Sequence, residues 1–273
     1  MSILQIIVLA LIQGTTEFLP VSSSGHLILV PALTGWPDQG LVTDMVTNLG
    51  TFFAVIVYFW FDVLAMLRGA IDTVKRQPTR QSRLLLNVLI GTVPIVAVGL
   101  IMKATHLDDH IRSTVLVACN TIIFGVLLYV FDAFGLARRT VADMTWKTSL
   151  IIGCAQALSL SPGTSRSGIT MTAARGLGFT RPDAARFSFL LSIPANGAAS
   201  VLVIGAAIES GETISAAMIL TGVLTFFIAL GTIAGLMRMV RHVSFLPFAI
   251  YRVALGVVLL ALIYSGVPLG AVN

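Results

Sequence analysis

The sequence predicts an all-α polytopic membrane protein, with six transmembrane helices and two re-entrant broken-helix pairs in an inverted-topology repeat. Composition gives the class, because 56% of the 273 residues are hydrophobic and only 11% are charged, whereas a soluble domain has about 25% charged residues. Apolar runs of about 18 residues or more recur along the chain, as membrane-spanning helices require. These runs are continuous, which argues against the alternating pattern of a β-barrel.

The apolar segments fall into two kinds. Six have the length and composition of full crossings, at residues 46–67, 84–102, 113–135, 186–208, 215–237 and 247–265. Two more apolar regions, at residues 3–30 and 149–175, are interrupted by Gly, Pro and Ser. Non-helical backbone at membrane depth is tolerated only where protein or a watery cavity surrounds it. We therefore expect the two interrupted regions to meet inside the helix bundle.

The basic residues predict the orientation. Thirteen of the 17 Lys and Arg residues lie in or beside four connections, at residues 68–83, 136–148 and 176–185 and around Arg238 and Arg241. The other connections carry the acidic residues Asp38, Asp44, Asp108, Asp109, Glu209 and Glu212. By the positive-inside rule the first set is cytoplasmic and the second external. The net charge of +5 therefore reports topology, and we expect no nucleic-acid partner.

Region 149–175 has cytoplasmic connections on both sides by this count, so it must enter and leave the membrane on the same side. We interpret it as a re-entrant pair of half-helices. Region 3–30 has no cytoplasmic charge to fix it, and by analogy we expect it to enter and leave from the outside. Three crossings follow each region. Because three is an odd number, the second set is inverted relative to the first.

The two interrupted regions also resemble each other in sequence. Residues 13–25 can be aligned with residues 156–168 at an offset of 143 positions, so that Gln matches Gln at the first position and Gly matches Gly at the last. We therefore predict a single integral membrane domain over residues 1–273, with one repeat at about 1–135 and a second at about 149–265.

Arg166 is the most informative polar residue. An arginine at membrane depth costs roughly a few kcal/mol on insertion scales and needs a partner. One alternative is a structural ion pair with Glu17. The other is an anion site, because the planar guanidinium group matches the oxygen atoms of phosphate. Pro20 and Gly163 break the helices, and the free N–H groups of the half-helices that follow would complete a diphosphate cradle.

The motif TEFLPVSSSGH contains three further side chains that can carry chemistry. Glu17 can pair with Arg166 or His26, ligate Mg²⁺ or Ca²⁺ between diphosphate oxygens, or act as a base. A lone His26 is more often structural, but beside Glu17 and a serine run it is a candidate general acid or base. Ser23 is either a helix cap or a nucleophile activated by His26. These residue types favour a phosphoryl-transfer site and an anion-transport site about equally.

Other polar residues give weaker signals. Asp62 and Asp132 lie near the predicted cytoplasmic ends of crossings, where we expect them to be solvated. Asn48 and Asn196 lie near the starts of crossings and are candidates to line the cavity. Arg252 begins the last crossing, and we expect its side chain to extend to the membrane interface.

The two polar motifs are long enough to carry a family resemblance. The signature motifs of the bacterial undecaprenyl-diphosphate phosphatases, the bacitracin-resistance family, are similar to QGTTEFLPVSSSGHLIL and AQALSLSPGTSRSG in this chain. Further family blocks resemble NLGTFFAVIVYFW, GTVPIVAVGL, ARFSFLLSIPA and FAIYRVALG, in the expected order. The resemblance implies an enzyme that removes the terminal phosphate of undecaprenyl diphosphate and so regenerates the lipid carrier for peptidoglycan synthesis. It also implies a divalent cation and a site at the outer face of the bacterial cytoplasmic (inner) membrane.

The resemblance assigns roles residue by residue. It implies that the catalytic residues are Glu17, Ser23, His26 and Arg166, with Glu17 also holding the metal. The candidate substrate-binding residues are Gln13, Ser22, Ser24, Gly163, Thr164, Ser165 and Ser167. Members with the pattern E-G-x-T-E have two acids, whereas Gln13 takes the first acidic position here. Gln13 can hydrogen-bond to phosphate or water but supplies no charge, which argues against an obligatory two-carboxylate mechanism.

Two alternatives stay open at this level. In the first mechanism Ser23 attacks the terminal phosphorus while His26 transfers protons; in its rival, water attacks directly and Ser23 only binds. The alternative function is a transporter or flippase of polyprenyl phosphate or another anion, an architecture that inverted repeats with broken helices favour. The expected partners are undecaprenyl diphosphate and membrane lipid, and a homodimer is kept as one alternative for the assembly.

Overall fold

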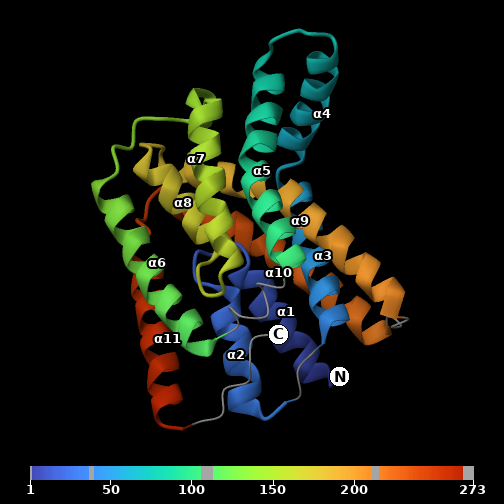
Figure 1. Cartoon of the computed structure of the whole chain (residues 1–273), viewed down its shortest axis with the longest axis vertical. Helices are drawn as coiled ribbons and strands as arrows, with labels where there is room; N and C mark the ends of the chain where they lie inside the picture. The colour runs from blue at the N-terminus through green and yellow to red at the C-terminus, as the bar shows by residue number, and fades with distance from the viewer. Residues whose placement is uncertain (1, 37–39, 106–112, 211–214, 267–273) are drawn as a thin grey trace.

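The computed structural model describes residues 2–36, 40–105, 113–210 and 215–266. Within these ranges the chain forms eleven α-helices (Figure 1) and has no β-strand beyond one isolated bridge between Arg139 and Phe179. The helices are α1 Ile3–Thr16, α2 Ser23–Thr34, α3 Leu41–Tyr58, α4 Trp60–Val74, α5 Arg80–Thr105, α6 Thr114–Phe134, α7 Trp146–Ala157, α8 Arg166–Gly176, α9 Arg181–Ser210, α10 Ala216–Met239 and α11 Leu246–Tyr264. The all-α prediction is confirmed.

The long helices match most of the predicted crossings. Four helices of the described chain, α5, α6, α10 and α11, are long and apolar enough to span a membrane, and the bent pair α3–α4 is a fifth candidate. The 30-residue helix α9 occupies the place of the remaining predicted crossing. The outer surfaces of these helices carry exposed large hydrophobic side chains, among them Phe61, Phe134 and Phe227. Such a surface suits lipid, and the protein is a multi-pass membrane protein.

The predicted crossing at residues 46–67 is wrong as a single straight helix. The chain bends by 81° between α3 and α4, at Phe59, whose backbone leaves the helical region with φ −99° and ψ 30°. The Phe59 ring is buried and packs on Phe189 of α9 at 5.8 Å between ring centroids. The segment contains neither Gly nor Pro at the bend, so tertiary packing overrides the local helical preference.

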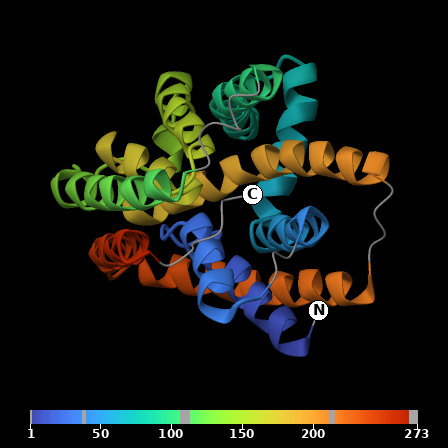
Figure 2. The same ribbon diagram turned by 60° about the horizontal axis from the view of Figure 1, so that its bottom comes forward.

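Both interrupted regions are broken as predicted. Helices α1 and α2 are separated by residues 17–22, and α7 and α8 by residues 158–165, which include a short 3₁₀ turn. Helix α1 packs along α10, and α7 packs along α5. Figures 1 and 2 show both breaks in the middle of the bundle, with α6 and α11 lying together on one side.

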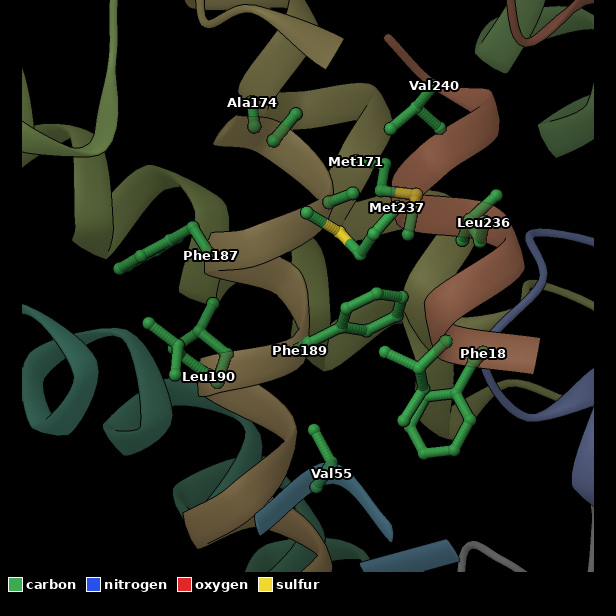
Figure 3. Packing of buried hydrophobic residues seen from close by; sticks show 14 of the residues in the cluster. Phe18, Val55, Met171, Ala174, Phe187, Phe189, Leu190, Leu236, Met237 and Val240 are labelled. Atoms are coloured by element: carbon green, nitrogen blue, oxygen red, sulfur yellow. The ribbon is translucent and has the colours of Figure 1, made fainter. Parts of the chain in front are cut away.

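An apolar cluster lies directly beneath the first break. Phe18 is fully buried and meets the edge of Phe189 at 5.4 Å between ring centroids. Figure 3 shows these two rings between α9 and α10, with Leu236 and Met237 above Phe18. Burial of a Phe side chain contributes about 1.5–3 kcal/mol relative to exposure. This packing fixes the position of Glu17, the residue that precedes Phe18.

The aspartates near the predicted cytoplasmic ends are not solvated, and the prediction that they are solvated is wrong. Asp132 is 3% exposed; its carboxylate accepts from Arg175 Nε at 2.8 Å, from Arg181 Nε at 2.8 Å and from the Phe245 backbone N–H at 3.0 Å. Asp62 is paired with Arg186. The basic residues counted as topology signals therefore also tie α6, α8, α9 and α11 together. Of the acids predicted to be external, Asp38, Asp108, Asp109 and Glu212 lie outside the described residues.

Candidate active site

The two breaks fold into the same local turn. Ser22 has φ 74° and Ser165 has φ 67°, a left-handed conformation that is uncommon for residues other than glycine. The two serines are 143 positions apart, the offset at which the two motifs align. Ser22 Oγ lies 3.2 Å from Ser24 Oγ, and Ser165 Oγ lies 3.3 Å from Ser167 Oγ. Each turn therefore places its hydroxyl groups at the first residues of a half-helix.

The breaks are joined by hydrogen bonds. The Gly163 backbone N–H donates to Ser24 Oγ at 3.0 Å, and the Ser167 hydroxyl donates to the Leu19 carbonyl at 3.1 Å. Gly163 has φ 88°, and a Cβ added there would collide with the Val117 carbonyl. Only glycine fits at this position. The predicted meeting of the two interrupted regions is thus present in the structure.

Arg166 pairs with Glu17 across the breaks. Arg166 Nη2 lies 2.7 Å from Glu17 Oε1, and Arg166 Nη1 donates to Asn196 Oδ1 at 2.8 Å. Both charged side chains are 14% exposed. Two of the five guanidinium N–H groups are used in these bonds, which leaves donors for a ligand. Asn196 lines the site, as its sequence position indicated.

Gln13 supports Glu17 from the preceding turn of α1. Its Nε2 donates to Glu17 Oε2 at 3.2 Å and to Asn48 Oδ1 at 2.9 Å. The side-chain amide of Gln13 therefore presents its NH2 group, and not its oxygen, to both acceptors. The residue that replaces an expected acid thus orients the remaining carboxylate, and Asn48 joins the same polar cluster.

His26 is held by two partners. Its Nδ1 lies 2.8 Å from the Ser22 carbonyl, and its Nε2 lies 2.6 Å from Tyr251 Oη. A carbonyl only accepts, so Nδ1 carries the hydrogen, and in the neutral ring Nε2 accepts from the Tyr251 hydroxyl. The His26 and Tyr251 rings are nearly parallel, at 7°. Both residues line a cavity of about 450 Å³ beside α1. Tyr251 received no role from the sequence, although it lies in the family block FAIYRVALG.

Ser23 begins α2 beside these groups. Within the described residues its hydroxyl has no hydrogen-bond partner, so the His26–Ser23 contact expected for an activated nucleophile is replaced by the His26–Tyr251 contact. The Ser23 hydroxyl is therefore free for a ligand. On the second break, Ser165 caps α8 by accepting from the Gly168 N–H at 3.2 Å, as predicted for a helix start.

Arg252 does not extend to the membrane interface, and that prediction is wrong. Its side chain is fully buried. Nη2 donates to the carbonyls of Gly163 and Thr164 at 2.9 and 2.8 Å, and Nε donates to the Thr121 carbonyl at 3.2 Å. The broken backbone supplies the acceptors that an unbroken helix would lack. Arg252 thereby holds the turn that leads into Arg166.

The donor set near Glu17 fits one kind of cation site. No group of three or more His, Cys, Asp or Glu side chains that could hold a metal occurs in the part of the chain that the structure describes. Mg²⁺ commonly binds through one or two carboxylates together with substrate phosphates and water. The single carboxylate of Glu17 matches such a shared site, in which a diphosphate and water would supply the other ligands.

Comparison with known proteins identifies the family. The family described as "Bacitracin resistance protein BacA" matches residues 6–258. The chain belongs to this family. It is 44% identical to the undecaprenyl-diphosphatase of Erythrobacter litoralis, over 96% of this chain and 99% of that protein. It is 45% identical to the undecaprenyl-diphosphatase of Roseobacter denitrificans, over 97% and 100%. It is 46% identical to that of Chromohalobacter salexigens, over 94% and 97%.

Proposed function

We propose that this protein is a membrane phosphatase that hydrolyses undecaprenyl diphosphate to undecaprenyl phosphate and inorganic phosphate. The relatives that match over nearly their whole length carry the name undecaprenyl-diphosphatase. The structural observation that carries the proposal is the partly accessible Arg166–Glu17 pair at the start of α8. Hydrolysis of the diphosphate returns the monophosphate carrier to peptidoglycan synthesis and accounts for bacitracin resistance in the family name.

Substrate binding uses the two half-helix starts. The terminal phosphate lies against Arg166, whose remaining N–H donors match phosphate oxygens. The first N–H groups of α2 and α8 and the partly exposed hydroxyls of Ser23, Ser24 and Ser165 complete the cradle. A Mg²⁺ or Ca²⁺ ion held by Glu17 would neutralise phosphate charge. The prenyl tail stays in lipid between the helices.

Two chemical routes fit this arrangement. In the first, Ser23 Oγ forms a bond to the terminal phosphorus while His26 takes the hydroxyl proton, the bridging P–O bond breaks and undecaprenyl phosphate leaves; water then hydrolyses the phosphoserine. In the second, water attacks the phosphorus directly, with His26 or Glu17 taking its proton. Positioning and charge neutralisation supply most of the catalysis in both routes. All groups named here belong to one chain, so the proposal applies to a monomer and to a homodimer alike.

The proposed location is the bacterial cytoplasmic (inner) membrane, with the site open to the outside. The support is the positive-inside count, which assigns the basic connections to the cytoplasm. The proposal also divides the chain into inverted repeats at about 1–135 and 149–265. The matched turns at Ser22 and Ser165 support that division, as do the corresponding packings of α1 on α10 and of α7 on α5.

The second candidate is a transporter or flippase of a polyprenyl phosphate, which the paired broken helices favour. Release of inorganic phosphate from undecaprenyl diphosphate by the purified protein tests the choice. We expect release with divalent cation and loss of release with chelator. Absence of release at every cation tested, together with movement of undecaprenyl phosphate across proteoliposomes, would establish the transporter instead.

A further inference from the structure

A second cavity lies at the end of the molecule where the basic connections gather, away from the Glu17–Arg166 cluster. Its volume is about 520 Å³, and it opens between the last turn of α6 and the loop that follows α8. It is lined by aromatic and aliphatic side chains on one wall and by two adjacent arginines on the other; the main lining residues are Phe131, Phe134, Leu136, Leu177, Arg138 and Arg139. The cavity thus combines an apolar wall with a basic one.

The loop that carries the arginines is fixed by backbone hydrogen bonds. Arg138 N and Arg139 N both donate to the Gly178 carbonyl, at 3.0 and 2.9 Å, and Thr180 N donates to the Arg139 carbonyl at 2.9 Å. Gly178 has φ 88°, which favours glycine. A Cβ added at Gly176 would collide with the Phe131 ring. The backbone of the residues that line the cavity is therefore held in one conformation.

The two arginines are free to bind an anion. Both are exposed, and within the described residues neither side chain forms an ion pair, unlike Arg175, Arg181 and Arg186. Asp143 is the neighbouring acid, and its carboxylate accepts from the Thr140 backbone N–H and hydroxyl, both at 2.9 Å. These bonds, with a smaller contribution from Arg139, lower the pKa of Asp143. The Asp143 carboxylate is thus hydrogen-bonded to Thr140 and forms no ion pair with Arg138 or Arg139 within the described residues.

The apolar wall lies on the outer surface of the molecule, at the end of α6. Phe134 is 81% exposed and Leu136 is 68% exposed, at the end of a helix apolar enough to span the bilayer. The end of such a helix lies near the depth where the acyl chains meet the headgroups. Basic pockets between helices on the cytoplasmic side bind anionic lipid headgroups.

We propose that this cavity binds an anionic phospholipid of the surrounding leaflet. The lipid phosphate lies between the guanidinium groups of Arg138 and Arg139, and an acyl chain lies along Phe131 and Phe134. The apolar wall selects a phospholipid over inorganic phosphate, and the unpaired arginines select an anionic lipid over a zwitterionic one. This inference does not depend on the phosphatase assignment.

Thermal unfolding of the delipidated, detergent-solubilised protein tests the proposal. Phosphatidylglycerol, phosphatidylcholine and inorganic phosphate are each added to three forms: the unchanged protein, Arg138→Gln/Arg139→Gln, and the control Arg80→Gln/Arg83→Gln. The control removes the same charge from exposed positions in the first turn of α5. We expect phosphatidylglycerol, but neither phosphatidylcholine nor inorganic phosphate, to raise the unfolding midpoint of the unchanged protein and of the control by several degrees. In Arg138→Gln/Arg139→Gln most of this rise should be lost.

A third variant, Phe134→Ala, removes apolar contact and leaves the charge unchanged; because Phe134 is largely exposed, its fold is preserved. We expect this variant to weaken the phosphatidylglycerol effect while its midpoint without lipid stays within a few degrees of the unchanged protein. An equal effect of phosphatidylglycerol on the unchanged protein and Arg138→Gln/Arg139→Gln would overturn the proposal. Equal loss in the Arg80/Arg83 control, or an equal rise with inorganic phosphate alone, would overturn it as well.

Discussion

Arg166 Nη2 lies 2.7 Å from Glu17 Oε1, across 149 positions of sequence. The contact joins the first broken region to the second and neutralises two charges inside a membrane protein. Each side chain keeps 14% of its surface exposed, so the pair can be reached by an anion. A bound diphosphate would compete with Glu17 for the same guanidinium group. The pair therefore links the two broken regions, and its guanidinium group is also where the negatively charged substrate would bind.

Glu17→Gln, Arg166→Gln and the double variant separate these two roles. Each single change leaves one charge unpaired, and we expect each to lower the free energy of unfolding by about 1–3 kcal/mol. The double variant has no unpaired charge and should recover most of that loss. Phosphate release should nevertheless fall by about 10²-fold or more in all three, as for loss of a transition-state donor. Unfolding midpoints and phosphate release are measured on the same preparations. Recovery of activity in the double variant would reduce the pair to a structural role.

Ser23 is the group on which the two chemical routes differ. If it is the nucleophile, Ser23→Ala abolishes turnover and substrate labelled at the terminal phosphate transfers label to the unchanged protein in acid-quenched samples. Ser22→Ala serves as the comparison within the same turn and should retain the label. Absence of label in the unchanged protein, or turnover within about tenfold of normal in Ser23→Ala, would assign the attack to water.

Tyr251 orients His26. Tyr251→Phe removes the hydroxyl that lies 2.6 Å from His26 Nε2 and keeps the stacked ring. The loss of one hydrogen bond of about 0.5–1.5 kcal/mol predicts a fall in kcat of about tenfold or less, with KM little changed and the pH dependence of kcat altered. Tyr129→Phe is the control, because Tyr129 is exposed on α6. An unchanged kcat and pH profile in Tyr251→Phe would remove Tyr251 from the site.

Gly168 provides the space that Arg252 occupies. A Cβ added at Gly168 would lie 2.6 Å from Arg252 Nη1, whereas nothing lies within 4 Å of one added at Gly231. We expect Gly168→Ala to lower the unfolding midpoint and phosphate release together, because it displaces the side chain that holds the turn before Arg166. Gly231→Ala should be neutral or stabilise the protein by up to about 1 kcal/mol through helix propensity. Equal midpoints for the two variants would show that the turn does not depend on Arg252.

The broken regions were predictable because their signals are local. Pro20 and Gly163 disfavour a continuous helix at these positions, and the Ser and Thr residues that follow them stabilise a new helix start. An unpaired arginine in an apolar region demands a partner, which is why Arg166 and Glu17 could be assigned to one site from sequence.

The missed features depend on contacts between distant segments. The bend at Phe59 follows from packing on Phe189, and no breaker residue marks it. The burial of Asp132 follows from two arginines that a charge count treats only as topology markers. Tyr251 and Arg252 are ordinary residues of an apolar helix until the broken backbone and His26 are placed beside them.

The contacts between the two breaks also constrain biosynthesis. Glu17, Leu19 and Ser24 acquire their partners Arg166, Ser167 and Gly163 only after more than half of the chain has been made. During translation the first broken segment therefore lacks these partners, and the Glu17 carboxylate has no arginine to pair with. A chain truncated before the second broken segment cannot form the hydrogen bonds and the ion pair between the two breaks. The first half therefore reaches its final structure only when the second half is present.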